Sequence, residues 1–261
     1  MKNYLYITAL FCVLLTSMQA QQYDQYIKKK FQDEVLGTMP YRMLLPENYD
    51  ASKKYPLVLL LHGSGERGND NELQLVHGAS LFLKDEIRKS FPAIIVFPQC
   101  AADSYWSNLE LTTDDQGTVF NFSVNRPPTT AMKLLNKLLD HLLESYPVNL
   151  DRVYVGGLSM GGMGTFEIVK RRPDLFAAAF PICGGAHPGT ARKLIAIPWW
   201  IFHGEQDNVV PSQFSVVMSE AIKKAGGNAK LTLYPNTGHD SWTQAFNETE
   251  LLPWLFSQQR N

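Results

Sequence analysis

The sequence has few cysteines, no excess of charge of either sign and no long hydrophobic run. Three cysteines in 261 residues are too few for the disulfide framework of small secreted domains. The 24 Lys and Arg face 25 Asp and Glu, a formal net charge of −1, so the cationic surplus that binds nucleic-acid phosphates is missing. No apolar segment reaches the ~20 residues that span a bilayer. We therefore predict no nucleic-acid partner and no membrane span.

The chain also lacks internal repeats, low-complexity tracts and Pro/Gly/Ser-rich linkers. At this length a folded chain buries roughly three quarters of the surface exposed by its unfolded form, so one core can form without a metal or disulfides. The 45% hydrophobic composition fits a globular protein. We predict a single folded domain, residues 21–261, of unspecified oligomeric state.

The first twenty residues have the features of a signal peptide. Lys2 precedes an apolar run from Tyr4 to Leu15, and a polar, small-residue stretch ends at Ala20; this pattern is typical of secretory leaders. We expect cleavage near Ala20 and a secreted or periplasmic protein. Only Cys100 and Cys183 would remain, and we expect both to be free thiols.

After the leader, short apolar runs alternate with segments of helical period. The runs are residues 57–61, 93–97, 153–155, 177–182, 199–202 and 230–234, and the helical segments are 129–146, 163–170, 211–225 and 241–256. This alternation predicts an α/β fold with a mostly parallel central sheet and helices on both faces. Residues 41–45 would form an antiparallel leading strand. Residues 101–128 lack a period and could hide a hairpin or helix, or form a flap beside the site.

A Gly-x-Ser-x-Gly segment, residues 157–161, follows a predicted strand and opens a predicted helix. In this setting it is typical of a nucleophile elbow, in which a sharp turn exposes the central serine, Ser159, at a helix N-terminus. The alternative interpretation is a glycine-rich turn without reactivity.

A serine nucleophile needs a base and an acid that orients it. Asp207 follows the apolar run 199–202, and His239 follows the run 230–234. The order Ser159, Asp207, His239 is that of α/β-hydrolases. Glu205 and Asp240 are weaker candidates for the acid, while strand-ending His62 and His203 are more typical of structural hydrogen-bonding residues.

Residues 61–68, Leu-His-Gly-Ser-Gly-Glu-Arg-Gly, form a predicted tight turn after the first parallel strand. Acyl transfer requires two N–H donors for the oxyanion, and we predict the amides of Met160 and Ser64. The turn matches neither the dinucleotide-binding nor the P-loop pattern.

Together, LHGSGERGND, FPQC, YVGGLSMGG, PICGG, HGEQDNVVP and TGHDSW resemble the α/β-hydrolase superfamily. Within it, the chain is similar to secreted bacterial carboxylesterases related to feruloyl esterases, acetyl xylan esterases and polyhydroxyalkanoate depolymerases, a group also labelled predicted peptidases. The resemblance covers residues 41–256. It implies Ser159 as nucleophile, His239 as general base, Asp207 as its orienting acid, and neither metal nor organic cofactor.

The resemblance implies a serine carboxylesterase acting on small or polysaccharide-linked esters, such as feruloyl or acetyl esters of hemicellulose. Trp106 and Trp242 are expected beside the site, where aromatic rings can bind substrate or simply pack the loops. Two alternatives stay open. One is an exported peptidase of the prolyl oligopeptidase type, and the other is a silent binding module that retains the fold.

Overall fold

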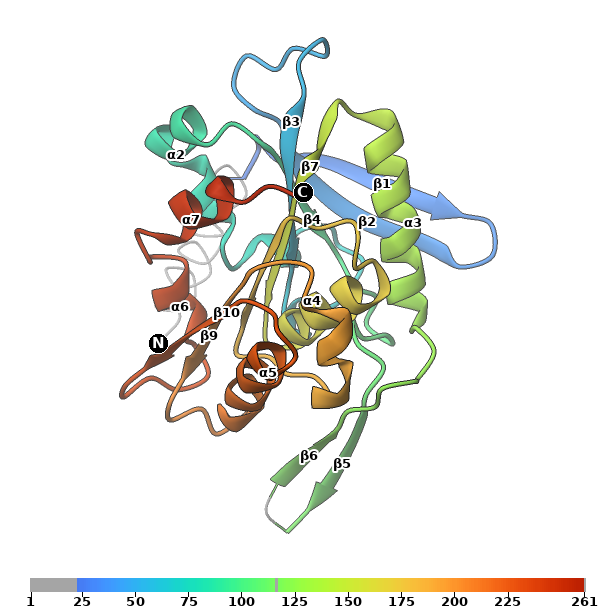
Figure 1. Cartoon of the computed structure of the whole chain (residues 1–261). Helices are drawn as coiled ribbons and strands as arrows, with labels where there is room; N and C mark the ends of the chain where they lie inside the picture. Colours follow the sequence, from blue (N-terminus) through green and yellow to red (C-terminus); the bar gives the residue numbers. More distant parts are fainter. Residues whose placement is uncertain (1–22, 116, 261) are drawn as a thin grey trace, which may run out of the picture.

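In the computed structural model, which describes residues 23–115 and 117–260, an eight-stranded sheet forms the centre of the molecule (Figure 1). The predicted signal peptide lies outside the described residues. In spatial order the strands are β1 (Ile27–Asp33), β2 (Gly37–Leu44), β4 (Ile94–Pro98), β3 (Tyr55–Leu61), β7 (Val148–Leu158), β8 (Ala178–Ile182), β9 (Trp199–Gly204) and β10 (Ala229–Tyr234). β2 is antiparallel to both β1 and β4, and all the other pairs are parallel.

Helices cover both faces of this sheet. Leu57 and Leu59 of β3 belong to a core cluster with residues of α3 (Thr130–Ser145), α4 (Met160–Arg171) and α5 (Gln213–Lys224). Val58 and Leu60 face the opposite way, into a second cluster with residues of the shorter α6 (Trp242–Ala245) and α7 (Leu251–Ser257). A further short helix, α2 (Asp85–Ser90), lies before β4. The predicted single-domain α/β fold is confirmed.

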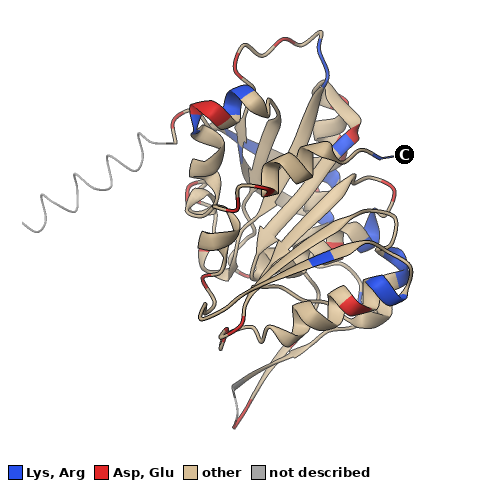
Figure 2. Cartoon of the chain, turned by 60° about the vertical axis from the view of Figure 1, so that its left-hand side comes forward, with Lys and Arg blue, Asp and Glu red and all other residues tan. Residues whose placement is uncertain are grey.

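Local sequence explains the central elements. Every residue of β3 is buried, as expected for a strand covered on both faces, which reads as a continuous apolar run. α3 begins after Thr129, whose hydroxyl accepts a hydrogen bond from the Met132 amide, an N-cap of the usual kind. Charged residues lie mainly on helices and loops around the sheet (Figure 2). None of the described helices is both long and apolar enough to cross a bilayer.

Two segments differ from the prediction. The predicted helix 241–256 is two short helices, because Pro253 lies in the first turn of α7; a continuous helix would bring its ring against the Thr249 carbonyl. The edge strand β1 was not predicted, since its consecutive lysines, residues 28–30, have none of the usual strand alternation.

The aperiodic segment 101–128 contains a hairpin, one of the two alternatives left open. Strands β5 (Glu110–Asp114) and β6 (Gly117–Asn121) pair antiparallel and project from the body of the molecule (Figure 1). At the base of the hairpin, the rings of Phe120 and Phe122 lie 5.7 and 5.3 Å from that of Phe214 on α5. This contact attaches the hairpin to the helix layer.

Candidate active site

The turn between β7 and α4 has the backbone of a nucleophile elbow. Ser159 adopts φ 53° and ψ −116°, a conformation that is strained for a residue with a side chain. The turn is tight: a Cβ on Gly161 would lie 1.9 Å from the carbonyl oxygen of Leu61. The Ser159 amide donates to the Ile182 carbonyl at 2.9 Å. The strained turn is therefore held by the two neighbouring strands.

The three predicted catalytic side chains meet at the carboxyl ends of the parallel strands. The Ser159 hydroxyl lies 3.0 Å from His239 Nε2, and His239 Nδ1 lies 2.7 Å from Asp207 Oδ2. The Asp207 side chain is fully buried, whereas the His239 side chain is 19% exposed. This is the geometry in which a carboxylate orients an imidazole that removes a serine proton.

The Asp207 carboxylate is held by more than His239. Its Oδ1 accepts from the amides of Val209 and Val210, both at 2.9 Å, and its Oδ2 also lies 3.1 Å from His203 Nε2. Burial opposes ionisation, but the hydrogen bonds from the two histidines and the two amides outweigh it and hold the pKa of Asp207 well below its ordinary value. Asp207 is thus an anion fixed beside His239.

Met160 and Ser64, the predicted oxyanion donors, each begin a helical segment. Met160 is the first residue of α4, and Ser64 is the first residue of a 3₁₀ turn, Ser64–Glu66. Amides at this position have no partner within their own helix and point outward from its N-terminus. Gly63, which precedes the 3₁₀ turn, lies close to Ser159: a Cβ on Gly63 would be 3.7 Å from the Ser159 Cβ. The turn therefore runs directly beside the candidate nucleophile.

The His62 side chain fixes this turn through two hydrogen bonds. Its Nε2 accepts from the Cys100 amide at 2.9 Å, so the proton sits on Nδ1, which donates to the Gly63 carbonyl at 2.7 Å. Burial lowers the pKa of His62 to about 4, which keeps the ring neutral. The interpretation of His62 as a structural hydrogen-bonding residue is confirmed.

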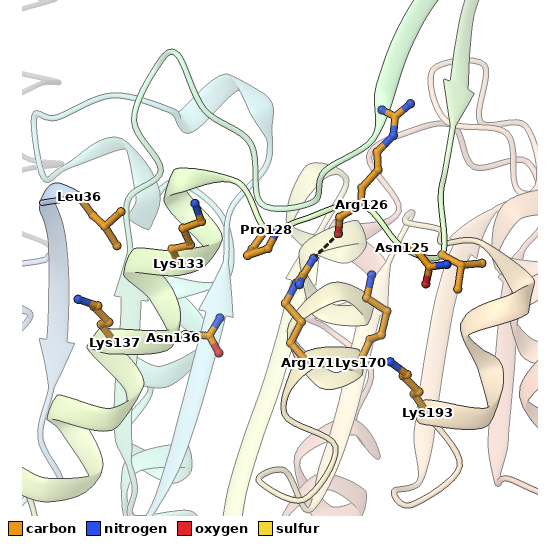
Figure 3. Close-up of a pocket in the computed structure, with 11 residues that line it drawn as sticks. Leu36, Asn125, Arg126, Pro128, Lys133, Asn136, Lys137, Lys170, Arg171 and Lys193 are labelled. Carbon is orange, nitrogen blue, oxygen red and sulfur yellow. Dashed lines mark hydrogen bonds between the residues drawn. The ribbon is translucent and has the colours of Figure 1, made fainter.

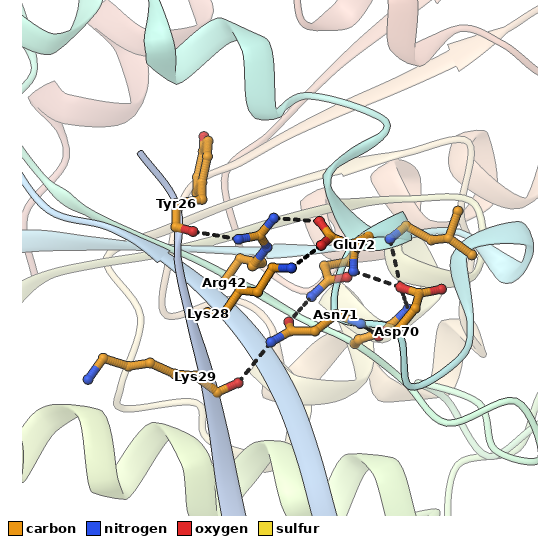
Figure 4. Close-up of polar contacts among 10 residues, drawn as sticks. Tyr26, Lys28, Lys29, Arg42, Asp70, Asn71 and Glu72 are labelled. Atoms are coloured by element: carbon orange, nitrogen blue, oxygen red, sulfur yellow. Dashed lines mark hydrogen bonds and ion pairs between the residues drawn. The ribbon is translucent and has the colours of Figure 1, made fainter. Parts of the chain in front are cut away.

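The segment that follows the turn is tied to the edge strand β1, because the Asn71 side chain donates to the Lys29 carbonyl at 3.1 Å (Figure 4). Arg67 donates to the carbonyls of Ser64 and Ala102, at 3.0 and 3.1 Å. The Gln99 side chain accepts from the Asn71 amide at 2.8 Å and donates to Asp70 at 3.0 Å. The short sequence 64–72 is therefore anchored at both ends.

The two tryptophans that we expected to bind substrate differ in their exposure. Trp106 is completely buried, and its indole N–H donates to the His62 carbonyl at 3.1 Å. It packs beneath the turn and offers no surface to a substrate, so the expectation for Trp106 is wrong. Trp242 is partly exposed, and its ring stands perpendicular to that of His239 with 5.3 Å between centroids.

Cys183 lies close to Asp207 and His239. Its sulfur, an Asp207 oxygen and a His239 nitrogen lie within 4.8 Å of one another. Burial raises the pKa of the Cys183 thiol, and the two other groups are bonded to each other, so the residues do not fit a metal ion, which needs a thiolate. Cys100 and Cys183 are both buried free thiols, as predicted.

Two cavities in the described part of the chain are large and have no triad residue in their lining. One, of about 800 Å³, lies near the C-terminal residues. Another, of about 660 Å³, is lined by six cations of α3, α4 and neighbouring loops (Figure 3). Glu167 neutralises two of them, Lys170 and Arg171. A smaller cleft has Trp242, whose ring contacts that of His239, in its wall.

With this geometry in place, comparison with known proteins gives the family. A family model described as Phospholipase/Carboxylesterase matches residues 48–250. The chain belongs to this family. The resemblance to α/β-hydrolase carboxylesterases is thereby confirmed.

Three similar proteins are esterases by name. The chain is 24% identical over 158 residues to a bifunctional acetylxylan esterase/xylanase of Neocallimastix patriciarum, covering 60% of the chain and 20% of that protein. It is 25% identical over 201 residues to the probable feruloyl esterase C of Aspergillus terreus, covering 76% and 66%. The crystal structure of a thermostable esterase superposes with a TM-score of 0.83 and 34% identity, covering 92% of this chain and 64% of that one. The chain thus spans between a fifth and two thirds of these proteins.

Three residues near the triad were not assigned a place there from the sequence. His203 was predicted as structural, but not as a partner of Asp207. Cys183 was predicted only as a free thiol, and His77 was given no role. His77 lies 5.0 Å, ring to ring, from Trp242 and 3.8 Å from Glu66. No local sequence signal marks His77, because only the folded chain brings residues 77 and 242 together.

Proposed function

We propose that this protein is a serine carboxylesterase with Ser159, His239 and Asp207 as its catalytic triad. The observation that carries the proposal is the continuous path of two hydrogen bonds, 3.0 and 2.7 Å, that joins the three side chains at the end of the sheet. The family supports the same chemistry.

The proposed reaction has two steps. The Ser159 oxygen attacks the ester carbonyl carbon while His239 Nε2 takes its proton, and Asp207 stabilises the imidazolium. The amides of Met160 and Ser64 stabilise the oxyanion, each worth ~3 kcal/mol in such sites. The alcohol then leaves with the proton from His239. In the second step water attacks the acyl carbon while His239 takes its proton. The bond from that carbon to Ser159 Oγ then breaks, and Oγ takes the proton from His239 as the acid leaves.

For the substrate, we propose feruloyl or acetyl esters of hemicellulose. Relatives named as acetylxylan and feruloyl esterases support this class. Such polymers lie outside the cell, and the predicted leader, residues 1–20, fits export. Trp242 is retained as a substrate contact because it is partly exposed beside His239.

The test is hydrolysis of para-nitrophenyl acetate and methyl ferulate by the purified protein and by Ser159→Ala. We expect the wild-type protein to hydrolyse para-nitrophenyl acetate and the variant to lose nearly all of this activity. Turnover of methyl ferulate as well would support the feruloyl class, and turnover of acetate alone would support acetyl esters. Equal activity in the wild-type protein and in Ser159→Ala would overturn the esterase proposal. Cleavage of a prolyl anilide but of neither ester would overturn it as well.

A further inference from the structure

A small cleft lies between the segment 76–84 and helix α6. Its volume is about 180 Å³, and its lining includes His77, Ser80, Trp242, Thr243, Phe246 and Asn247. Its two walls meet where Gly78 abuts Phe246: a Cβ on Gly78 would lie 2.6 Å from the ring. A side chain at position 78 would push the walls apart, so the width of the cleft is set by this contact.

One residue of the cleft wall, Trp242, connects the cleft to the proposed triad. The Trp242 ring, which forms part of its wall, also contacts the His239 ring at 5.3 Å and the His77 ring at 5.0 Å. The His77 ring in turn lies near Glu66, on the turn that carries Ser64. A molecule in the cleft would therefore be one aromatic ring away from the proposed general base.

The direction of the reaction decides which half of the ester this cleft can hold. When the tetrahedral intermediate collapses, its bond to the leaving oxygen breaks, and that oxygen takes the proton from His239 Nε2 while the acyl group stays on Ser159. The leaving oxygen must then lie within hydrogen-bond reach of His239. The alcohol half therefore lies on the side of His239, whose ring contacts Trp242 of the cleft wall.

We propose that this cleft is the subsite for the sugar residue that forms the alcohol half of such an ester. The inference rests on the proposed esterase function. Trp242 and Phe246 offer apolar ring surface, while Ser80, Thr243 and Asn247 offer hydroxyl and amide groups. Asn247 Nδ2 donates to the Thr243 carbonyl at 2.8 Å, and its amide oxygen has no partner among the described residues. One sugar ring has this mixture of C–H faces and hydroxyls, and its size fits the volume.

The test compares esters that share an acyl group and differ in the alcohol. The pairs are methyl ferulate with a feruloylated arabino-oligosaccharide, and ethyl acetate with acetylated xylo-oligosaccharides. Each pair is assayed with wild type, Trp242→Ala, Trp242→Phe and Asn247→Ala. Asn228→Ala is the matched control, because Asn228 is also exposed but lines a separate cavity.

We expect the wild type to prefer the sugar ester in kcat/KM for the acyl group that it accepts. Trp242→Ala should reduce that preference by about tenfold or more, Trp242→Phe should restore most of it, and Asn247→Ala should reduce it by roughly threefold. Asn228→Ala should leave it unchanged.

Two results would overturn the cleft assignment while leaving the esterase intact. One is equal kcat/KM for sugar and simple alkyl esters in the wild type. The other is an equal loss on both esters in Trp242→Ala and no change in Asn247→Ala, which would mean that Trp242 only supports His239. Failure of the proposed esterase function would give a different result, namely hydrolysis that does not depend on Ser159.

Discussion

Asp207 is shared between two histidines. Its Oδ2 faces His239 Nδ1 at 2.7 Å and His203 Nε2 at 3.1 Å. His203 is completely buried, and its other nitrogen lies 2.7 Å from the Ser215 hydroxyl, which donates to the Gly184 carbonyl at 3.0 Å. His203 contacts neither Ser159 nor a substrate site. We therefore interpret it as a positioning residue that fixes the carboxylate.

Replacement of His203 should lower activity by loosening Asp207. For His203→Ala we expect kcat/KM on para-nitrophenyl acetate to fall by about 10- to 100-fold, because small displacements of a catalytic group are costly. His203→Gln, whose amide can still donate to Oδ2, should recover part of the loss. The loss should appear in kcat more than in KM. An unchanged kcat in a folded His203→Ala protein, verified by circular dichroism, would refute the positioning role.

His62 should make the protein sensitive to mild acid. The folded-state pKa of about 4 lies below the ordinary value of 6.5, so between these values the unfolded chain binds a proton that the folded chain does not. Stability must then fall as pH decreases through this window, by up to about 3 kcal/mol. Urea unfolding of the wild type at neutral pH and near pH 4.5 measures the loss.

The control for this prediction is His62→Gln, which cannot take a proton. The variant should be less stable than the wild type at neutral pH, because the bonds to Cys100 and Gly63 are perturbed. Its stability should change less between the two pH values. An equal change in both proteins would assign the acid sensitivity to other groups.

At the level of elements, the junction of β7 and α4 depends on glycine at two positions. The Gly161 Cβ of an alanine variant would fall 1.9 Å from the Leu61 carbonyl oxygen, and a Cβ on Gly157 would fall 2.5 Å from the Gly161 carbonyl oxygen. Both clashes are with backbone, so no side chain can move aside to relieve them. Glycine here permits the close approach of strand, turn and helix.

Gly161→Ala should therefore lower both stability and activity. We expect a loss of about 3 kcal/mol or more, measured by urea unfolding, because overpacking against backbone exceeds the usual cost of an added methyl group. Gly65→Ala is the matched control, since it lies in the neighbouring turn and its Cβ would meet nothing within 4 Å. It should change stability by less than about 0.5 kcal/mol. A similar cost for both variants would contradict this account of the elbow.

The elements that could be predicted from the sequence are those buried in the core. Strands such as β3, which are buried on both faces, read as unbroken apolar runs, and α3 has a clear helical period. β1 was not predicted, because an exposed edge strand needs no apolar pattern. The meeting of Ser159, Asp207 and His239 could be predicted because parallel strands bring their carboxyl ends to one edge of the sheet. The burial of Trp106 could not, since it depends on how the segment 101–108 packs under the turn.

At the scale of the whole molecule, two ion pairs on Glu72 join the antiparallel edge of the sheet to the segment 64–72 (Figure 4). Arg42 of β2, only 4% exposed, donates to the Tyr26 carbonyl at 2.6 Å and to the Glu72 carboxylate at 2.5 Å. Lys28 of β1 binds the same carboxylate from the solvent side. Glu72 thus lies between a buried and an exposed cation.

These two cations should differ sharply in their contribution to stability. Glu72→Ala leaves the buried Arg42 guanidinium without its carboxylate, and we expect a loss of about 1–3 kcal/mol. Lys28→Ala removes only the exposed partner, whose side chain is 57% accessible, so the loss should be below about 0.5 kcal/mol. Urea unfolding of both variants measures the difference. Equal losses would mean that the Tyr26 carbonyl compensates Arg42 sufficiently. The edge strands would then hold the segment 64–72 by packing rather than by charge.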